Sequence, residues 1–251
     1  MDTVFHLVDI DLIQLALACA VAFLASVMSG IAGYGAGLIL PVFLAPLVGV
    51  TNVIPMMSLV ILLNNFSRVL AFRQNIEWKP AGLILCLGIP GCLLGAWSYT
   101  LLSSRWVALL LGLFLLCSVP LRRVLHRTHF RISSLSLCFA GGMFGFINGG
   151  MAGTGVILIS IMMSAGLQGM ALIATDGIIG VVMAITKILL FGSMSRLTPE
   201  LALVGLMVGL CTSPGAFIAR KLLAHIPLKI HVWVMEAMVV AGAFSLLWQA
   251  L

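Results

Sequence analysis

The strongest constraint on this chain is a series of long apolar stretches that contain almost no charged residues. A helix of about 20 apolar residues is long enough to cross a lipid bilayer. Only 8% of the 251 residues are charged and 62% are hydrophobic, whereas a soluble domain has roughly 25% charged residues. The sequence therefore predicts an all-α polytopic membrane protein. Ten apolar segments are expected, at residues 12–29, 37–50, 52–71, 81–100, 105–121, 135–152, 155–167, 169–191, 200–219 and 229–250.

The beginning of the chain differs from a cleaved signal peptide. Such peptides open with a positively charged region, but Asp2, Asp9 and Asp11 precede the first apolar segment here. We therefore expect this segment to be kept as a helix. The basic residues lie mostly in short loops and the net charge is only +6, a distribution that favours membrane orientation over nucleic-acid binding. We therefore expect the protein to be surrounded by the lipid bilayer and not to bind nucleic acid.

Two glycine-rich stretches interrupt the apolar pattern. "GIAGYGAGLILPVFL" covers residues 30–44, and "NGGMAGTGVILISIMM" covers residues 148–163. Irregular backbone inside a bilayer is tolerated only where protein encloses it or where it lines a water-filled cavity. New helices are expected to start near Leu38 and Val156. Both are short, since 14 residues of helix cover only about 21 Å of a hydrocarbon core about 30 Å thick, so we expect half-helices or hairpin arms.

The two halves of the chain share residues in the same order. Positions 119 apart hold similar residues in three cases, namely Arg68 and Lys187, Phe72 and Phe191, and Pro80 and Pro199. The glycine stretches match at an offset of 118, through Gly35 and Gly153 and through Gly37 and Gly155. Shared order at a fixed offset indicates an internal duplication. We predict an N-terminal repeat at residues 1–121, a basic cytoplasmic linker at 122–134 and a C-terminal repeat at 135–251.

Loop charge predicts how the two repeats are related. With five segments in each half, the second repeat is inverted, and nine basic residues fall in inner loops while Arg105 and Arg196 fall in outer loops. With four crossings in each half the split falls to seven and four. Because basic residues prefer the cytoplasmic side, the sequence favours inverted repeats with both chain ends outside.

An anion site is the expected purpose of the glycine stretches. Helix N-termini present free N–H groups and a partial positive charge, and inverted repeats would aim two of them at one midplane site, as in secondary transporters. The alternative is that these glycines only allow close helix packing. The predicted substrate-binding residues are Gly33, Gly35, Gly37, Asn64, Asn65, Arg68, Asn148, Gly149, Gly150, Gly153, Thr154, Gly155 and Lys187.

Charged residues within the segments support this hypothesis. Arg68 and Lys187 either attract the anion from opposite sides or extend to the lipid headgroups. Asn64 and Asn65 either bind substrate oxygens or join helices. Asp176 is an acid inside the apolar segment at 169–191, so it is predicted to couple transport to a proton or sodium gradient, with a helix-joining hydrogen bond as the alternative.

Catalytic and metal-binding patterns are not found in the sequence. The five histidines and six cysteines have no ligand spacing, and no nucleophile and base are paired. We expect neither an enzyme nor a cofactor. A carrier or channel for a small anion such as a carboxylate is consistent with these residues, and an intramembrane enzyme is a weaker alternative.

The duplicated stretches "GIAGYGAGLILP" and "GFINGGMAGTGVILI", together with "IPG" at 89–91 and "SPG" at 213–215, resemble the TauE/SafE family. The resemblance covers nearly the whole chain. It implies a protein of the bacterial inner (cytoplasmic) membrane that moves sulfite, sulfoacetate or related sulfonates. Members typically carry a Gly-x-Gly-Gly-Gly-like run and then a proline in each stretch, from which Ala36, Thr154 and Ile159 depart here.

Overall fold

The computed structural model describes residues 12–32, 36–125, 133–222, 240, 243–244 and 247–248. Within these residues the chain is all helical, as predicted, and it contains no strand. The main helices are α2 (Leu12–Ala32), α3 (Ala36–Val48), α4 (Val50–Phe72), α5 (Trp78–Thr100), α6 (Ser104–Leu125), α7 (Ser134–Gly150), α8 (Gly155–Ser164), α9 (Gly169–Ser193) and α10 (Pro199–Leu222). A short 3-10 turn, η1 (Arg73–Asn75), joins α4 to α5.

Five of these helices are long and apolar enough to cross a membrane: α2, α4, α5, α9 and α10. Their outward side chains are large and apolar, as shown by Leu24 of α2 at 61% exposure and Leu189 of α9 at 67%. A soluble protein would not leave so many such side chains in water, but lipid tails solvate them. The helices therefore present the surface that a multi-pass membrane protein requires.

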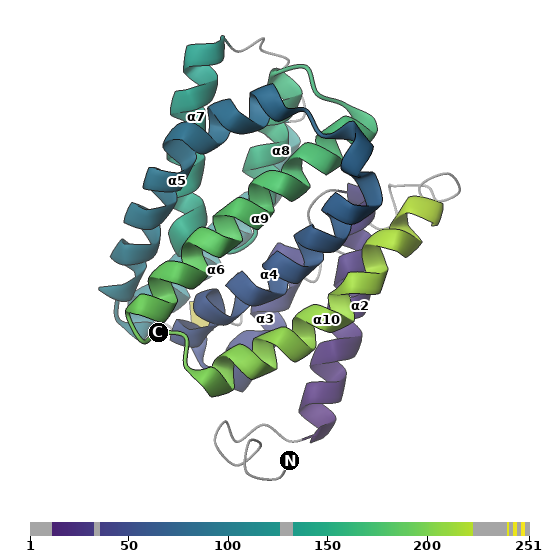
Figure 1. Ribbon diagram of the computed structural model, residues 1–251. Helices are drawn as coiled ribbons and strands as arrows, with labels where there is room; N and C mark the ends of the chain where they lie inside the picture. The colour runs from purple at the N-terminus through teal and green to yellow at the C-terminus, as the bar shows by residue number, and fades with distance from the viewer. Residues whose placement is uncertain are drawn as a thin grey trace.

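Figure 1 shows α4 and α9 crossing the middle of the molecule, with α5 and α7 on one side and α2 and α10 on the other. The two central helices run antiparallel, because Arg68 near the end of α4 donates to the carbonyl of Ile173 near the start of α9 (3.2 Å). Buried polar side chains gather between these two helices and include Asn64, Asn65 and Asp176. The polar interior of the protein therefore lies along the contact between α4 and α9.

Helices α5 and α7 pack at very short range because glycines line their contact. The glycines are Gly88, Gly91 and Gly95 of α5 and Gly141, Gly145 and Gly149 of α7. A Cβ at Gly145 would overlap the carbonyl oxygen of Gly88, and one at Gly95 would overlap that of Phe146. The pair α2 and α10 has a smaller version of this contact, where Gly215 lies against Ser26. Small residues allow such close approach in membrane helices.

The two short helices follow the two glycine-rich stretches. Helix α3 begins at Ala36 and has 13 residues, while α8 begins at Gly155 and has 10 residues. The predicted starts near Leu38 and Val156 were therefore correct to within two residues. Before α8 the chain turns through Gly153, whose φ of +81° is a conformation that favours glycine.

Some sequence predictions fall outside the part of the chain that the structure describes. The linker at 122–134 and the segment at 229–250 are largely among them, as are Gly33, Gly35 and all five histidines. The division into repeats and their inverted relation stay predictions. The helix contacts made by the two halves of the chain match. If α2 is exchanged with α7, α4 with α9 and α5 with α10, the α5–α7 contact becomes the α2–α10 contact, the α5–α9 contact becomes the α4–α10 contact, and the α4–α9 contact is unchanged.

Candidate functional site

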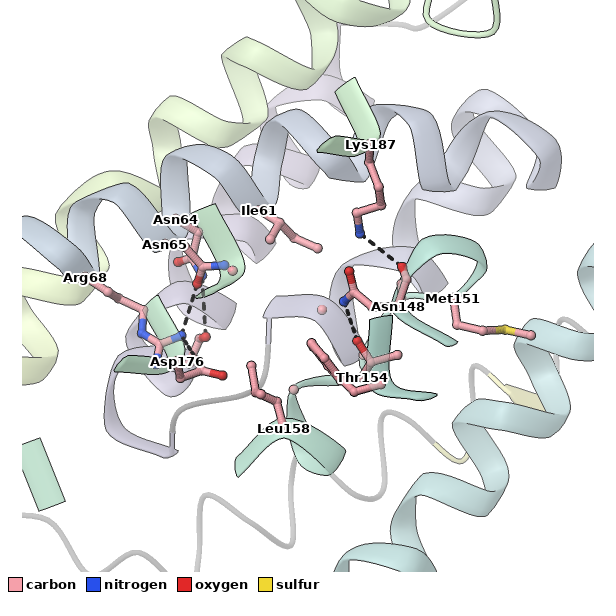
Figure 2. Close-up of a pocket in the computed structure, with 17 residues that line it drawn as sticks. Ile61, Asn64, Asn65, Arg68, Asn148, Met151, Thr154, Leu158, Asp176 and Lys187 are labelled. Atoms are coloured by element: carbon pink, nitrogen blue, oxygen red, sulfur yellow. Dashed lines mark hydrogen bonds and ion pairs between the residues drawn. The ribbon is translucent and has the colours of Figure 1, made fainter. Parts of the chain in front are cut away.

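A cavity of about 70 Å³ lies between α4, α9 and the beginnings of α3 and α8. This is room for several water molecules, since one water needs roughly 15 Å³ of such space. Polar residues lie at its two ends, and Ile61 and Leu158 lie between them (Figure 2). The structure brings together ten of the residues selected from the sequence, which are Gly37, Asn64, Asn65, Arg68, Asn148, Gly153, Thr154, Gly155, Asp176 and Lys187.

One end of the pocket is occupied by an ion pair. The guanidinium of Arg68 lies 2.6 Å from the Asp176 carboxylate, and both side chains are almost fully buried. Arg68 also donates to Oδ1 of Asn65 (3.1 Å) and to the carbonyl of Ile173 (3.2 Å). Asn65 reaches this position because Gly180 has no side chain, since a Cβ there would overlap the Asn65 amide. Arg68 is thus held by α9 and its own helix.

The other end of the pocket carries a lysine without an acid. Lys187 of α9 is 2% exposed, and its ammonium group donates to the main-chain carbonyl of Asn148 (3.3 Å). Among the described residues, no carboxylate lies within ion-pair distance of it. A buried charge without a partner is strongly unfavourable. This end of the pocket therefore has the charge that an anion would neutralise, and Lys187 does not extend to the lipid headgroups.

The N-terminal ends of α3 and α8 both lie at the pocket. Gly37 in the first turn of α3 lies against Gly153, so that a Cβ on Gly37 would be 3.1 Å from the Gly153 nitrogen. No side chain caps the N-terminus of α8 at Thr154. The first N–H groups of an α-helix have no partner within the helix, so this end is open to a hydrogen-bonding ligand.

Two asparagines add polar groups that lack partners. The Oδ1 atoms of Asn64 and Asn148 are buried and make no hydrogen bond, while their Nδ2 atoms meet Ser29 Oγ (3.5 Å) and Thr154 Oγ1 (2.6 Å). A hydroxyl can donate or accept, so either amide can rotate by half a turn and keep its hydroxyl partner. The rotation replaces an unpaired acceptor with an N–H donor, which suits an anion.

The structure places two of the selected glycines away from the cavity wall. Gly149 and Gly150 lie at the end of α7, and the closest atoms to them belong to α5, around Cys92 and Gly95. Their surroundings match the alternative of close helix packing. Sequence reasoning also missed several wall residues, namely Ser29, Ile61, Phe144, Met151, Ala152, Leu158 and Gly180. Four of these carried a signal, because Ser29 directly precedes the first glycine stretch and Met151, Ala152 and Leu158 lie within the second.

Metal chemistry has no support in the part of the chain that the structure describes. No group of three His, Cys, Asp or Glu side chains is placed there to hold an ion. What the pocket combines instead is one uncompensated ammonium group, backbone N–H groups and two amides. This is a combination suited to a small oxyanion.

Comparison with known proteins gives one match. A family model described as sulfite exporter TauE/SafE matches residues 18–246, which includes every described residue of the pocket. No curated protein and no solved structure matches the chain.

Proposed function

The chain belongs to the TauE/SafE sulfite exporter family, and from this premise we propose that it is a secondary transporter of small anions. The family and the five long apolar helices make it a multi-pass membrane protein that transports sulfur-containing anions. The finer proposal is that sulfite, or a sulfonate such as sulfoacetate, moves by alternating access around the pocket. The proposed location is the inner (cytoplasmic) membrane of a bacterium.

The observation that carries this proposal is the buried Lys187 without an acidic partner. In the proposed complex its ammonium group binds a substrate oxygen. The amides of Asn64 and Asn148, the Thr154 hydroxyl and the N-terminus of α8 donate to the other oxygens. Each of these groups lines the cavity or opens onto it, and together they satisfy an anion that is enclosed away from water.

The size of the cavity favours the smaller candidates. About 70 Å³ corresponds to the room for roughly four or five water molecules. Sulfite has four heavy atoms and fits such a space, whereas sulfoacetate has twice as many and requires the pocket to open further. Among the sulfur anions considered, sulfite is therefore the first substrate to test.

Alternating access needs two halves that can exchange roles. Two observations support the proposal of inverted repeats. Helices α4 and α9 are antiparallel, and the main helix contacts are preserved when the matching helices of the two halves are exchanged. In this proposal α2 with α10 and α5 with α7 move around the site between α4 and α9. Asp176 is the proposed coupling residue, with a proton as the coupling ion, because it is a buried carboxylate on the wall of the pocket.

Counterflow in proteoliposomes tests the proposed function. We expect the purified protein to exchange labelled sulfite against internal sulfite with saturation, and to exchange sulfoacetate or isethionate more slowly because of their size. Acetate and lactate complete the panel, and vesicles without protein are the control. Saturable exchange of a carboxylate but of no sulfur anion would favour the alternative substrate, and flux without saturation or counterflow would favour a channel.

Labelling of engineered cysteines tests the inverted repeats. Gln74 in η1 and Ser193 at the end of α9 are exposed and follow equivalent helices, α4 and α9. In inverted repeats we expect a membrane-impermeant maleimide to label Gln74→Cys from the cytoplasmic side only and Ser193→Cys from the outside only. Ser103→Cys should behave like Ser193→Cys, since Arg196 donates to the carbonyl of Thr100 (3.0 Å) and so joins these loops.

The unsubstituted protein gives the baseline for this labelling, because its own cysteines are present throughout. Labelling of Gln74→Cys and Ser193→Cys from the same side would contradict the inverted relation and indicate direct repeats with an even number of crossings.

A further inference from the structure

The charges on the wall of the pocket do not cancel. Two cations and one acid line it among the described residues: Arg68, Lys187 and Asp176. Arg68 is committed to Asp176 at 2.6 Å and to two further acceptors, whereas Lys187 contacts only a main-chain carbonyl. With Asp176 ionised, the empty pocket therefore has one net positive charge, and it is located at the Lys187 end.

The duplicated sequence explains why the two ends differ. Arg68 and Lys187 are 119 positions apart, and the position that corresponds to Asp176 at the same offset is Met57. Met57 is buried and uncharged. The two cations therefore occupy matching positions in the sequence but have different partners. Among the described residues, an acid neutralises Arg68 and none neutralises Lys187.

We propose that the pocket selects anions by charge, holding a singly charged oxyanion at Lys187 and accepting a doubly charged one only together with a proton on Asp176. This inference rests on the proposed function and adds the substrate's charge class and its proton count. The step is balanced: the Asp176 carboxylate gains one proton and becomes a neutral carboxyl, and the pocket then has two positive charges for two negative ones. Protonation also releases the Arg68 guanidinium from its ion pair.

Among the described residues, Arg68 is the one charged group paired with Asp176. The elements packed against α9 carry Arg68 on α4, Arg73 on η1 and Lys79 near the start of α5, with Glu77 just before it. Of these, only Arg68 is within ion-pair distance. Helices α7 and α8 carry no charged residue, and Lys187 is three turns further along α9.

Sulfate and methanesulfonate are a matched pair of probes. Both are tetrahedral, both have five heavy atoms, and they differ by one unit of charge over the accessible pH range. We expect the wild-type protein at pH 8 to bind methanesulfonate about tenfold or more tightly than sulfate, because an unneutralised charge in an enclosed site is strongly unfavourable. At lower pH sulfate binding should approach that of methanesulfonate, whose own affinity should stay constant.

Calorimetry in two buffers with different ionisation enthalpies then counts protons without any mutation. We expect uptake of about one proton for each sulfate bound and none for each methanesulfonate. Asp176→Asn should remove the pH dependence and reverse the preference, since the pocket then keeps two positive charges. Glu77→Gln is the matched control, because it removes the same charge from an exposed position outside the pocket and should leave both affinities unchanged.

Equal affinities for the two probes in the wild-type protein, or sulfate binding without proton uptake, would overturn this inference while sulfite counterflow still supported the proposed function. Absence of sulfite counterflow and of binding by either probe, in folded protein, would overturn both. The wild-type measurements decide the matter even where Asp176→Asn fails to fold.

Discussion

We expect Lys187→Met to abolish sulfite counterflow while the protein stays folded. The ammonium group of Lys187 is the charge at its end of the pocket that has no acidic partner among the described residues. Removing one member of a buried charged pair costs roughly 2 kcal/mol or more, which is about thirtyfold in affinity. In the loaded transporter the pair is Lys187 and the anion, so the loss should appear in binding and in exchange.

The fold should tolerate this change. Methionine has nearly the length and volume of lysine, and replacing a buried charge by an apolar side chain of similar size is often neutral or stabilising. The lost hydrogen bond to the Asn148 carbonyl offsets this by about 1 kcal/mol. Thermal unfolding in detergent should therefore show little change. Lys79→Met is the matched control, because Lys79 is exposed at the start of α5 and should retain counterflow. Normal counterflow in Lys187→Met would contradict the role of Lys187.

The same substitution at Arg68 provides a contrast within this experiment. Arg68→Met would leave the buried Asp176 carboxylate without its partner at 2.6 Å, a defect that costs about 3–5 kcal/mol when the acid stays ionised. The two cations, which lie at matching sequence positions, should therefore differ in what their removal damages. Loss of Arg68 lowers the thermal stability, and loss of Lys187 lowers substrate binding.

Much of the fold could be predicted from the sequence because each span is a long apolar run with clear ends. The segment expected at 169–191 is α9 (Gly169–Ser193), and the one expected at 155–167 is α8 (Gly155–Ser164). The family resemblance was confirmed by the match over residues 18–246. What apolar runs do not encode is the pairing of helices, since a lipid-facing side and a protein-facing side can have the same composition. The close contact of α5 with α7 was therefore not predicted, and close packing of helices was considered only as an alternative for the two glycine-rich stretches.

Many of the residues that line the pocket were selected from the sequence, but the contacts between them were not predicted. Arg68 and Asp176 were both selected, yet one as an anion-attracting group and the other as a coupling acid, and their ion pair spans 108 positions of sequence. It forms because α4 and α9 are antiparallel, a tertiary fact that no local pattern contains. Gly149 and Gly150 were selected because they belong to the same glycine-rich stretch as Gly153. In the structure these two glycines, at the end of α7, pack against α5, whereas Gly153 lines the cavity.

A second large effect is expected at the contact between α5 and α7. Gly145→Ala adds one methyl group where a Cβ would overlap the carbonyl oxygen of Gly88. In an isolated helix, alanine would be more stable than glycine by about 1 kcal/mol. Here the added methyl group forces two backbones in contact apart, so we expect the net effect on stability to be a loss. We expect a loss of unfolding free energy on the order of 3 kcal/mol, measured as a lower midpoint of thermal unfolding in detergent by tryptophan fluorescence.

Gly82→Ala is the control that separates packing from helix propensity. Gly82 lies in α5, the helix against which Gly145 packs, and a Cβ there would meet no atom within 4 Å, so this variant should be as stable as the parent or slightly more stable. The close contact also holds α7 in position, and α7 ends beside Asn148 and the pocket. Gly145→Ala should therefore lower sulfite counterflow together with stability, whereas Lys187→Met lowers counterflow alone. Equal stability of Gly145→Ala and Gly82→Ala would mean that α5 and α7 are not in backbone contact in the membrane.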